Sequence, residues 1–216
     1  MREGLFIVLE GVEGAGKSTQ ALLLSRWMKA LGISHIRARE PGGTPVGEAI
    51  RSIVLDRGEL TMPPETELFL ILAARAAFVR EVVRPALEGG TVVLADRFDF
   101  STFAYQGYGR GLDLAQVEKA NALATGGLAP HLVLVLDLPV EAGLERKGSG
   151  EGTDRIEREG KFFLEKVRDG YRALAVDNPR VRLVSGEKSP DSVQKTLREI
   201  LVETFPGTFT SVEGEK

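Results

Sequence analysis

The stretch that most constrains the fold is GVEGAGKS, residues 11–18, which directly follows the apolar run Leu5–Glu10. It matches G-x-x-x-x-G-K-[ST], a phosphate-binding loop between a strand and a helix. Glycines let successive backbone N–H groups turn toward a phosphate, and the next helix adds the positive end of its dipole. We expect Lys17 to neutralise the β and γ oxygens and Ser18 to ligate Mg²⁺. The residues expected to hold a nucleoside triphosphate are Gly11, Val12, Glu13, Gly14, Ala15, Gly16, Lys17, Ser18, Thr19 and, further along the chain, Arg146.

Apolar runs that alternate with helical patterns predict an α/β fold. The five expected strands are Leu5–Glu10, His35–Arg39, Thr91–Ala95, Leu132–Asp137 and Val181–Val184. Several are nearly continuous in Val, Ile and Leu, which is typical of strands buried on both faces of a parallel sheet. The pattern predicts a doubly wound sheet with ligands at the carboxyl ends of its strands.

Helices are expected between the strands. Lys17–Leu31 has helical periodicity and is followed by Gly32, a common left-handed residue after a helix. Glu65–Leu87 is a longer candidate that ends before Gly89-Gly90, and we expect Pro85 to bend its last turn.

Composition sets further limits on the function. The chain has 216 residues without internal repeats, so one domain is expected over residues 1–205, with a frayed tail at 206–216. A formal net charge of −3 argues against broad nucleic-acid binding. The absence of cysteine excludes disulfides and thiolate catalysis, and His35 and His131 are expected to be structural or to face solvent. Neither a signal peptide nor a membrane-spanning run is recognised, so a cytoplasmic protein is expected.

The phosphate loop alone leaves the class of nucleotide-binding protein open. GTPases carry N-K-x-D and D-x-x-G, and the chain has neither motif. Motors and AAA-type ATPases normally need a longer chain. The remaining class is a small kinase that passes the γ-phosphate to an acceptor.

The acceptor side is marked by arginines near predicted strand ends, Arg39, Arg51, Arg75 and Arg97. Arginine suits bidentate recognition of phosphate, so this group favours an anionic acceptor. Pro41-Gly42-Gly43 is expected to form a tight turn that lets a ligand approach the backbone. Asp96 ends a buried strand, where a carboxylate directed at Mg²⁺ is expected.

Several motifs together resemble the thymidylate kinase (dTMP kinase) family over nearly the whole chain. They are EGVEGAGKSTQ, REPGGT, AAR at 73–75, ADRF…ST.AYQGYGRG and DRIE at 154–157. The resemblance implies a P-loop nucleoside monophosphate kinase fold, with a five-stranded parallel sheet flanked by helices and a small lid at about 145–157. It also implies a homodimer that uses ATP and Mg²⁺ to phosphorylate dTMP to dTDP in dTTP synthesis.

The same resemblance implies roles for individual residues. Arg75 and Arg97 are expected to hold the acceptor phosphate, and Glu13 to lie near the 3′-hydroxyl of the acceptor sugar and the transferring phosphate. Arg155, with Arg146 or Lys147, is expected to close over the transferring group. The expected dTMP pocket comprises Glu13, Arg39, Pro41, Arg51, Ile71, Arg75, Arg97, Ser101, Thr102, Tyr105 and Gln106.

The chain departs from the family pattern in two places. The family usually has a Phe that stacks on thymine four residues before the arginine of AAR, and this chain has Ile71, while Phe69 faces away. The lid LERKGSGEGTDRIE has Gly148, Ser149 and Gly150 where more basic residues are common. These departures leave two alternatives open: a kinase for another or a broader set of pyrimidine monophosphates, and a nucleotide-binding regulatory module with little turnover.

Overall fold

A five-stranded parallel sheet forms the centre of the computed structural model, which describes residues 4–56, 60–147 and 155–210. The strands are β1 (Phe6–Glu10), β2 (His35–Arg39), β3 (Val92–Asp96), β4 (Leu132–Asp137) and β5 (Val181–Ser185). Their order in the sheet is β2-β3-β1-β4-β5, and all neighbouring pairs are parallel. Each strand lies within one residue of its expected bounds, so the predicted fold class is confirmed.

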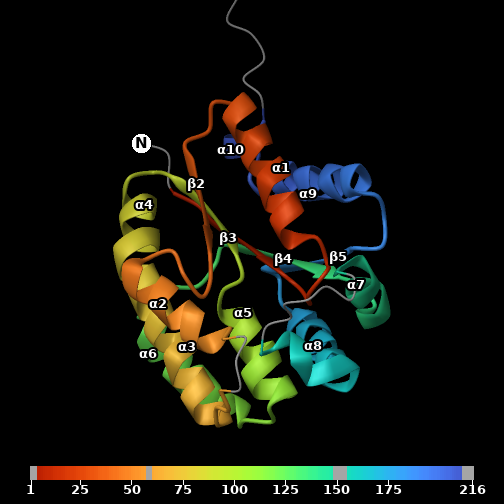
Figure 1. Ribbon diagram of the computed structural model, residues 1–216. Coiled ribbons are helices and arrows are strands. Elements are labelled where there is room, and N and C mark those ends of the chain that lie inside the picture. The colour runs from red at the N-terminus through yellow and green to blue at the C-terminus, as the bar shows by residue number, and fades with distance from the viewer. Residues whose placement is uncertain (1–3, 57–59, 148–154, 211–216) are drawn as a thin grey trace, which may run out of the picture.

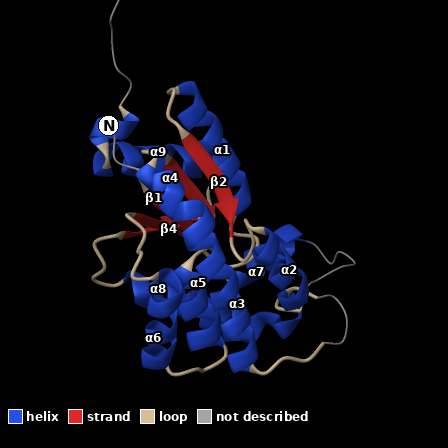
Figure 2. Ribbon diagram, turned by 90° about the vertical axis from the view of Figure 1, so that its left-hand side faces the viewer, coloured by secondary structure: helices blue, strands red, loops and turns tan. Residues whose placement is uncertain are grey.

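Helices cover both faces of this sheet. They are α1 (Lys17–Ala30), α2 (Pro45–Val54), α3 (Pro64–Phe78), α4 (Arg84–Glu88), α5 (Asp99–Thr102), α6 (Leu114–Thr125), α7 (Val140–Lys147), α8 (Gly160–Ala175), α9 (Pro190–Thr204) and α10 (Pro206–Phe209). Figure 1 shows α1 and α9 on one side of the strands and α3, α5 and α8 on the other, and Figure 2 gives the view turned by 90°. Among the described residues, no helix is long and apolar enough to cross a membrane.

The strand register places the polar residues at one edge of the sheet. β1 is buried along its whole length, because it lies at the centre of the sheet with helices on both faces. Leu9 pairs with Asp96, and Asp96 pairs in turn with Arg39 on β2. The carboxyl ends of the three strands therefore meet, and the loop that follows β1 lies beside Asp96 and Arg39.

The long helix expected at Glu65–Leu87 is a continuous helical stretch with a change of pitch. Between α3 and α4 the segment Val79–Val83 is π-helical, and the Arg84 N–H donates to the carbonyl of Val79. Pro85 cannot donate to the residue four positions earlier and its ring crowds that carbonyl. The wider π-helical turn accommodates Pro85, where the sequence predicted a bend.

The prediction of a frayed tail from residue 206 is wrong for its first residues. Pro206–Phe209 forms α10, and the ring of Phe209, 1% exposed, stacks on Trp27 with the ring centroids 5.5 Å apart. An isolated Phe in a stretch without periodicity gives no signal for this contact. Residues 211–216 lie outside the described residues.

Both histidines have structural partners, as the sequence predicts. The ring of His35 lies 2.8 Å from the Ser25 hydroxyl and 2.8 Å from the Ile33 carbonyl. The Phe6 N–H donates to Nδ1 of His131 over 2.8 Å.

Candidate active site

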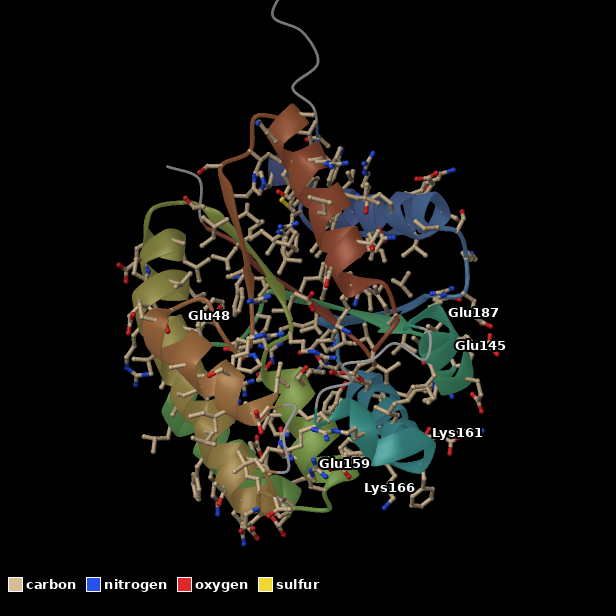
Figure 3. The ribbon with its side chains drawn as sticks, viewed as in Figure 1. Glu48, Glu145, Glu159, Lys161, Lys166 and Glu187 are labelled. Carbon is tan, nitrogen blue, oxygen red and sulfur yellow. The ribbon has the colours of Figure 1, made fainter. Side chains whose placement is uncertain are left out.

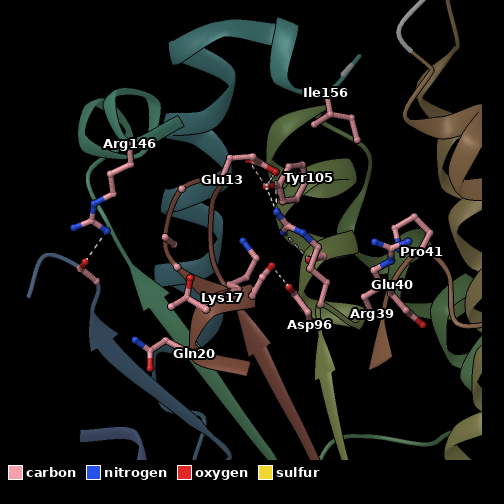
Figure 4. A pocket seen from close by; sticks show the side chains of 18 of the residues that line it. Glu13, Lys17, Gln20, Arg39, Glu40, Pro41, Asp96, Tyr105, Arg146 and Ile156 are labelled. Atoms are coloured by element: carbon pink, nitrogen blue, oxygen red, sulfur yellow. Dashed lines mark hydrogen bonds and ion pairs between the residues drawn. The ribbon is translucent and has the colours of Figure 1, made fainter. Parts of the chain in front are cut away.

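A cavity of about 820 Å³ lies at the carboxyl ends of the strands, between the glycine-rich loop and the ends of β2 and β3 (Figure 4). The sequence-predicted residues that line it are Glu13, Gly14, Ala15, Gly16, Lys17, Ser18, Thr19, Arg39, Pro41, Arg51, Ile71, Arg75, Asp96, Arg97, Ser101, Tyr105, Gln106 and Arg146. The predicted residues outside this lining are Gly11, Val12, Thr102 and Arg155.

The loop before α1 has the backbone of a phosphate cradle. Gly11, Gly14 and Gly16 have φ values of 137°, 74° and 94°, which side-chain-bearing residues rarely adopt. A Cβ on Gly14 would lie 2.3 Å from the carbonyl oxygen of Gly143 in α7, so a side chain there would clash. The loop can therefore turn its N–H groups inward at the start of α1, where the helix dipole favours an anion.

Lys17 places its ammonium group inside this loop. Its Nζ donates to the carbonyls of Gly11 and Val12, over 3.0 and 2.8 Å, and the residue is 8% exposed. Burial, together with the positive charge of Arg97, lowers the pKa of Lys17 to about 8. A phosphate beside the ammonium would favour its charged form, so the site is built for an anionic ligand.

Ser18 and Asp96 provide two hard oxygen ligands next to the loop. The Ser18 hydroxyl donates to Oδ2 of Asp96 over 2.8 Å, a contact between the start of α1 and the end of β3. Within the described part of the chain, no three His, Cys, Asp or Glu side chains gather as a metal cage. This small donor set fits Mg²⁺, which keeps most of its water and phosphate ligands and takes only one or two from protein.

Arg97 is held in place by several partners. One terminal nitrogen of its guanidinium donates to the Gly11 carbonyl and the Tyr171 hydroxyl, each over 3.1 Å, and the other to Glu13 over 2.7 Å and Tyr105 over 3.1 Å. Its φ of 73° is unusual for a residue with a side chain and is strained by about 1–3 kcal/mol. This strained backbone aims the guanidinium at the loop, 86 residues earlier in the chain.

Glu13 is the acidic partner of this arginine. Burial tends to raise its pKa, but the charges of Arg97 and Lys17 outweigh burial and hold the pKa below the usual value. The Tyr105 hydroxyl also donates to Glu13, over 2.8 Å to one carboxylate oxygen and 2.9 Å to the other. Glu13 is therefore ionised at neutral pH and fixes the side chains around it.

Arg75 occupies a different environment from the phosphate-binding one expected. It is 1% exposed, and its N–H groups donate to Glu40, Thr102, Asn121 and the Phe98 carbonyl over 2.7 to 2.9 Å. These four hydrogen bonds and the ion pair with Glu40 engage all three nitrogens of the guanidinium. Arg75 is thus held by protein partners while it lines the cavity, and Thr102 supports it from outside the cavity lining.

Two buried carboxyl groups lie near Arg75. Burial raises the pKa of Glu40 to about 7 and that of Asp99 to about 6, with Arg75 acting in the opposite direction on both. Glu40 lines the cavity and Asp99 does not. The end of the cavity near Glu40 therefore carries less negative charge at neutral pH than its carboxyl groups suggest.

Three further predicted arginines have the following partners. Arg39 pairs with Glu48 over 3.2 Å, with 57% of its side chain exposed. Arg51 donates to the Pro41 carbonyl over 3.0 Å. Arg146 donates to the Gly186 carbonyl over 2.9 Å, on the opposite side of the glycine-rich loop from Arg39 (Figure 4). These arginines place positive charge at both ends of the cavity.

Arg155 lies outside the cavity lining, in an ion pair with the buried Glu67. It donates to the carboxylate of Glu67 and, over 3.1 Å, to the carbonyl of Val54. The rest of the predicted lid, residues 148–154 and the side chain of Lys147, lies outside the described residues.

Gln106 and Ile71 form the end of the cavity expected to take a base. The Gln106 Nε2 donates to Glu67 over 2.7 Å, and its Oε1 is buried without a hydrogen-bond partner. Ile71 is 8% exposed and lines the cavity, whereas Phe69 on the same helix is 64% exposed. The predicted helix register is therefore confirmed.

Sequence reasoning missed several parts of the site, and two of them show why. One is Glu67, which the pattern of α3 alone does not distinguish from Glu65. The other is Gly186–Pro190, which follows β5 and begins α9, with Ser189 capping the helix through a 3.3 Å bond to the Ser192 N–H. A Ser-Pro pair after a parallel strand is a recognisable helix start, so this signal was available in the sequence.

Comparisons with known proteins agree with one another. The thymidylate kinase family model matches residues 9–197. A thymidylate kinase of Pseudomonas fluorescens (strain Pf-5) is 48% identical over 199 residues, covering 92% of this chain and 95% of that protein. One from Desulfovibrio desulfuricans is 48% identical over 205 residues, covering 91% and 94%. The crystal structure of thymidylate kinase from Ehrlichia chaffeensis superposes with a TM-score of 0.73 at 28% identity, covering 92% of this chain and 99% of that one.

Proposed function

The chain belongs to the thymidylate kinase family, and from that premise we propose that it transfers the γ-phosphoryl group of ATP to dTMP, yielding ADP and dTDP for dTTP synthesis. The observation that carries the proposal is one cavity with a phosphate loop at one end and a fixed carboxamide, Gln106, at the other. A reaction on free nucleotides fits the cytoplasmic location expected from the sequence.

The donor end is assigned to the glycine-rich loop. Its N–H groups and Lys17 hold the ATP phosphates, and Arg146 borders the same end of the cavity. Ser18 and Asp96 would hold Mg²⁺, directly or through water. The metal ion would supply charge neutralisation between the β- and γ-phosphates.

The acceptor phosphate is assigned to Arg97, with Arg39 and Arg51 around it. Two anions that repel each other must be brought into line, and fixed cations lower that barrier without covalent chemistry. An acceptor phosphate can replace part of the present partners of Arg97, whose neighbours Glu13 and Tyr105 then face the sugar. No general base is required, because the attacking phosphate oxygen is already anionic.

The base is assigned to the pocket formed by Gln106 and Ile71. Thymine offers an N3–H donor, and Gln106, which lines the cavity, has a buried Oε1 acceptor without a hydrogen-bond partner. A buried acceptor without a partner costs about 1–3 kcal/mol, which a ligand donor recovers. Uracil has the same N3–H, and this chain has Ile71 where the family usually has a Phe that stacks on thymine. A broader pyrimidine monophosphate kinase is therefore the second candidate.

Steady-state kinetics with saturating ATP and a panel of dTMP, dUMP and dCMP separate these candidates. We expect kcat/KM for dTMP to exceed that for dUMP by about tenfold or more, because one methyl group in an apolar pocket supports about 1–3 kcal/mol of discrimination. Equal use of dTMP and dUMP would move the assignment to the broader kinase. Binding without turnover of any of the three would identify a regulatory module.

Ile71→Phe is predicted to lower the KM for dTMP by a few-fold with little change in kcat. Stacking of a base on an aromatic ring is worth about 1–3 kcal/mol, and Ile already provides part of that contact. The ring would help ground and transition states alike, so kcat should hardly change. Phe69→Leu, on the exposed face of the same helix, is the matched control. A raised KM in Ile71→Phe would show that another side chain fills the space over the base.

We also propose that two copies of the chain form a homodimer through α2 and α3, which pack against each other. Val46 and Ile53 on α2, and Phe69 on α3, are 54%, 44% and 64% exposed. Neighbouring apolar side chains exposed on two packed helices are typical of a surface that another protein covers. Figure 1 shows both helices on the side of the molecule away from α7.

Phe69→Glu is therefore expected to shift the chain from dimer to monomer in sedimentation equilibrium at micromolar concentration. The substitution places a charge where an apolar side chain meets its partner, and burying an unpaired charge is costly. Phe162→Glu is the control, because Phe162 lies on α8 and is 71% exposed. An unaltered chain that is monomeric across the micromolar range would contradict the dimer.

A further inference from the structure

Glu67, in the first turn of α3, is a buried carboxylate to which neither the loop nor the phosphate sites assign a task. Its side chain is 1% exposed. Gln106 donates to its Oε1 over 2.7 Å, and Arg110 to its Oε1 and Oε2 over 3.2 and 2.9 Å. Arg155 donates to its Oε2 as well. Three donors, two of them from the segment around Gln106 and Arg110 and the third from Arg155, thus converge on one carboxylate.

The charge on this carboxylate is maintained by its neighbours. Burial tends to raise the pKa of Glu67, but hydrogen bonds from Arg110, Gln106 and Arg155 outweigh burial and hold the pKa below its usual value. Arg110 also pairs with Glu159, which Figure 3 places beside the start of α8. The cluster consists of two acids, Glu67 and Glu159, and two arginines, Arg110 and Arg155, so its net charge is zero. Glu67 can therefore stay ionised at neutral pH.

An ionised carboxylate only accepts hydrogen bonds. Gln106 must therefore turn its NH₂ group toward Glu67, which leaves its carbonyl oxygen as a buried acceptor without a partner, on a residue that lines the cavity. Without Glu67 the amide could rotate by 180° and present either group to a base. The orientation that Glu67 fixes suits thymine and uracil, which carry N3–H, and opposes cytosine, whose N3 is an acceptor.

The same carboxylate also holds the segment that begins at Arg155. Arg155 donates to Glu67 and to the carbonyl of Val54, the last residue of α2. Its neighbour Ile156 lines the cavity, as does Val54. A change at Glu67 therefore reaches both the base-reading amide and the chain segment beside the base.

We propose that Glu67 is a positioning residue for base selection: it locks the Gln106 amide in the orientation that accepts a base N3–H, and Arg155 latches the segment of Arg155 and Ile156 onto the same carboxylate. The inference rests on the proposed function and adds the means by which the base pocket excludes cytosine. In this arrangement Arg155 orders the pocket and does not contact the transferring phosphoryl group.

Glu67→Gln tests the proposal, because a glutamine at 67 can donate as well as accept and so frees the Gln106 amide to rotate. We expect the ratio of kcat/KM for dTMP to that for dCMP to fall by at least about tenfold, since a site built to hydrogen-bond a ligand group discriminates strongly by that bond. The KM for dTMP should rise while the KM for ATP stays the same. Glu65→Gln, on an exposed residue of the same turn, should change neither.

Removing one charge from a buried cluster can unfold the chain, so a second variant is needed. Glu67→Gln combined with Arg155→Gln removes one negative and one positive charge and keeps the cluster neutral. This double variant should show the same loss of selectivity, whether read from kinetics or from equilibrium binding of dTMP and dCMP. The lost latch should also raise the KM for dTMP.

An unchanged dTMP-to-dCMP ratio in either folded variant would overturn the role of Glu67. A fall in kcat with constant KM for dTMP in Arg155→Gln alone would overturn the latch and return Arg155 to the transferring group. Failure of the proposed function is distinguishable from both, because the unaltered chain would then show no turnover of dTMP.

Discussion

Lys17→Ala is expected to lower the turnover of dTMP by at least about a hundredfold, on the scale of losing one preorganised electrostatic contact in a buried site. The ammonium lies inside the loop and donates to the carbonyls of Gly11 and Val12. Alanine removes the cation that neutralises the β and γ oxygens, and residues 11–18 contain no second lysine. Steady-state kinetics with both substrates saturating measures the loss.

The fold of Lys17→Ala should survive. Burial lowers the pKa of Lys17, so the charged ammonium is not well solvated in the folded chain and its removal should not lower the unfolding temperature. Lys29→Ala, on an exposed residue of the same helix, is the control for general effects on α1. Near-normal turnover in a folded Lys17→Ala would contradict the assignment of the loop to ATP.

Arg97→Ala and Arg97→Gly should each lower kcat/KM for dTMP by about 10³-fold, the scale of an arginine that stabilises charge in phosphoryl transfer. Both substitutions remove the guanidinium that bonds Glu13 and the Gly11 carbonyl. The two variants should differ in stability, because residue 97 has a φ of 73°. Glycine adopts that conformation without strain, so Arg97→Gly should be more stable than Arg97→Ala by about 1 kcal/mol.

Urea unfolding of the two variants measures this difference. If both variants lose the same activity and Arg97→Gly is more stable than Arg97→Ala, the backbone strain at residue 97 serves to place the arginine side chain. If Arg97→Ala retained most of the activity, the acceptor phosphate would have to be held by Arg39 or Arg51 instead. Equal stability of the two variants would mean that residue 97 relaxes once its side chain is gone.

The glycine-rich loop and the parallel strands that carry the site could be predicted from local sequence. A glycine-rich loop fixes its own backbone, and buried parallel strands are readable from runs of Val, Ile and Leu. Given parallel strands, the carboxyl ends must meet at one edge, which is why Ser18 and Asp96 were correctly expected to lie together, as the 2.8 Å contact shows. These predictions need only short-range patterns and one topological rule.

The partners of the buried arginines could not be predicted in the same way. The family resemblance and the chemistry of arginine lead us to expect Arg75 at the acceptor phosphate, and neither indicates its partners Glu40 and Asn121, which lie 35 and 46 residues away. Arg155 and Glu67 are 88 residues apart. Which arginine meets a ligand and which meets a carboxylate depends on tertiary packing, and a single sequence carries no local signal for that choice.

The central claim is a kinase reaction at a single cavity, and phosphorus NMR of the chain with ATP, Mg²⁺ and dTMP tests it most directly. We predict that the dTDP and ADP signals appear together in a one-to-one ratio, and that neither forms when dTMP is omitted. ADP released at the same rate without dTMP, or ATP left intact in its presence, would contradict the claim.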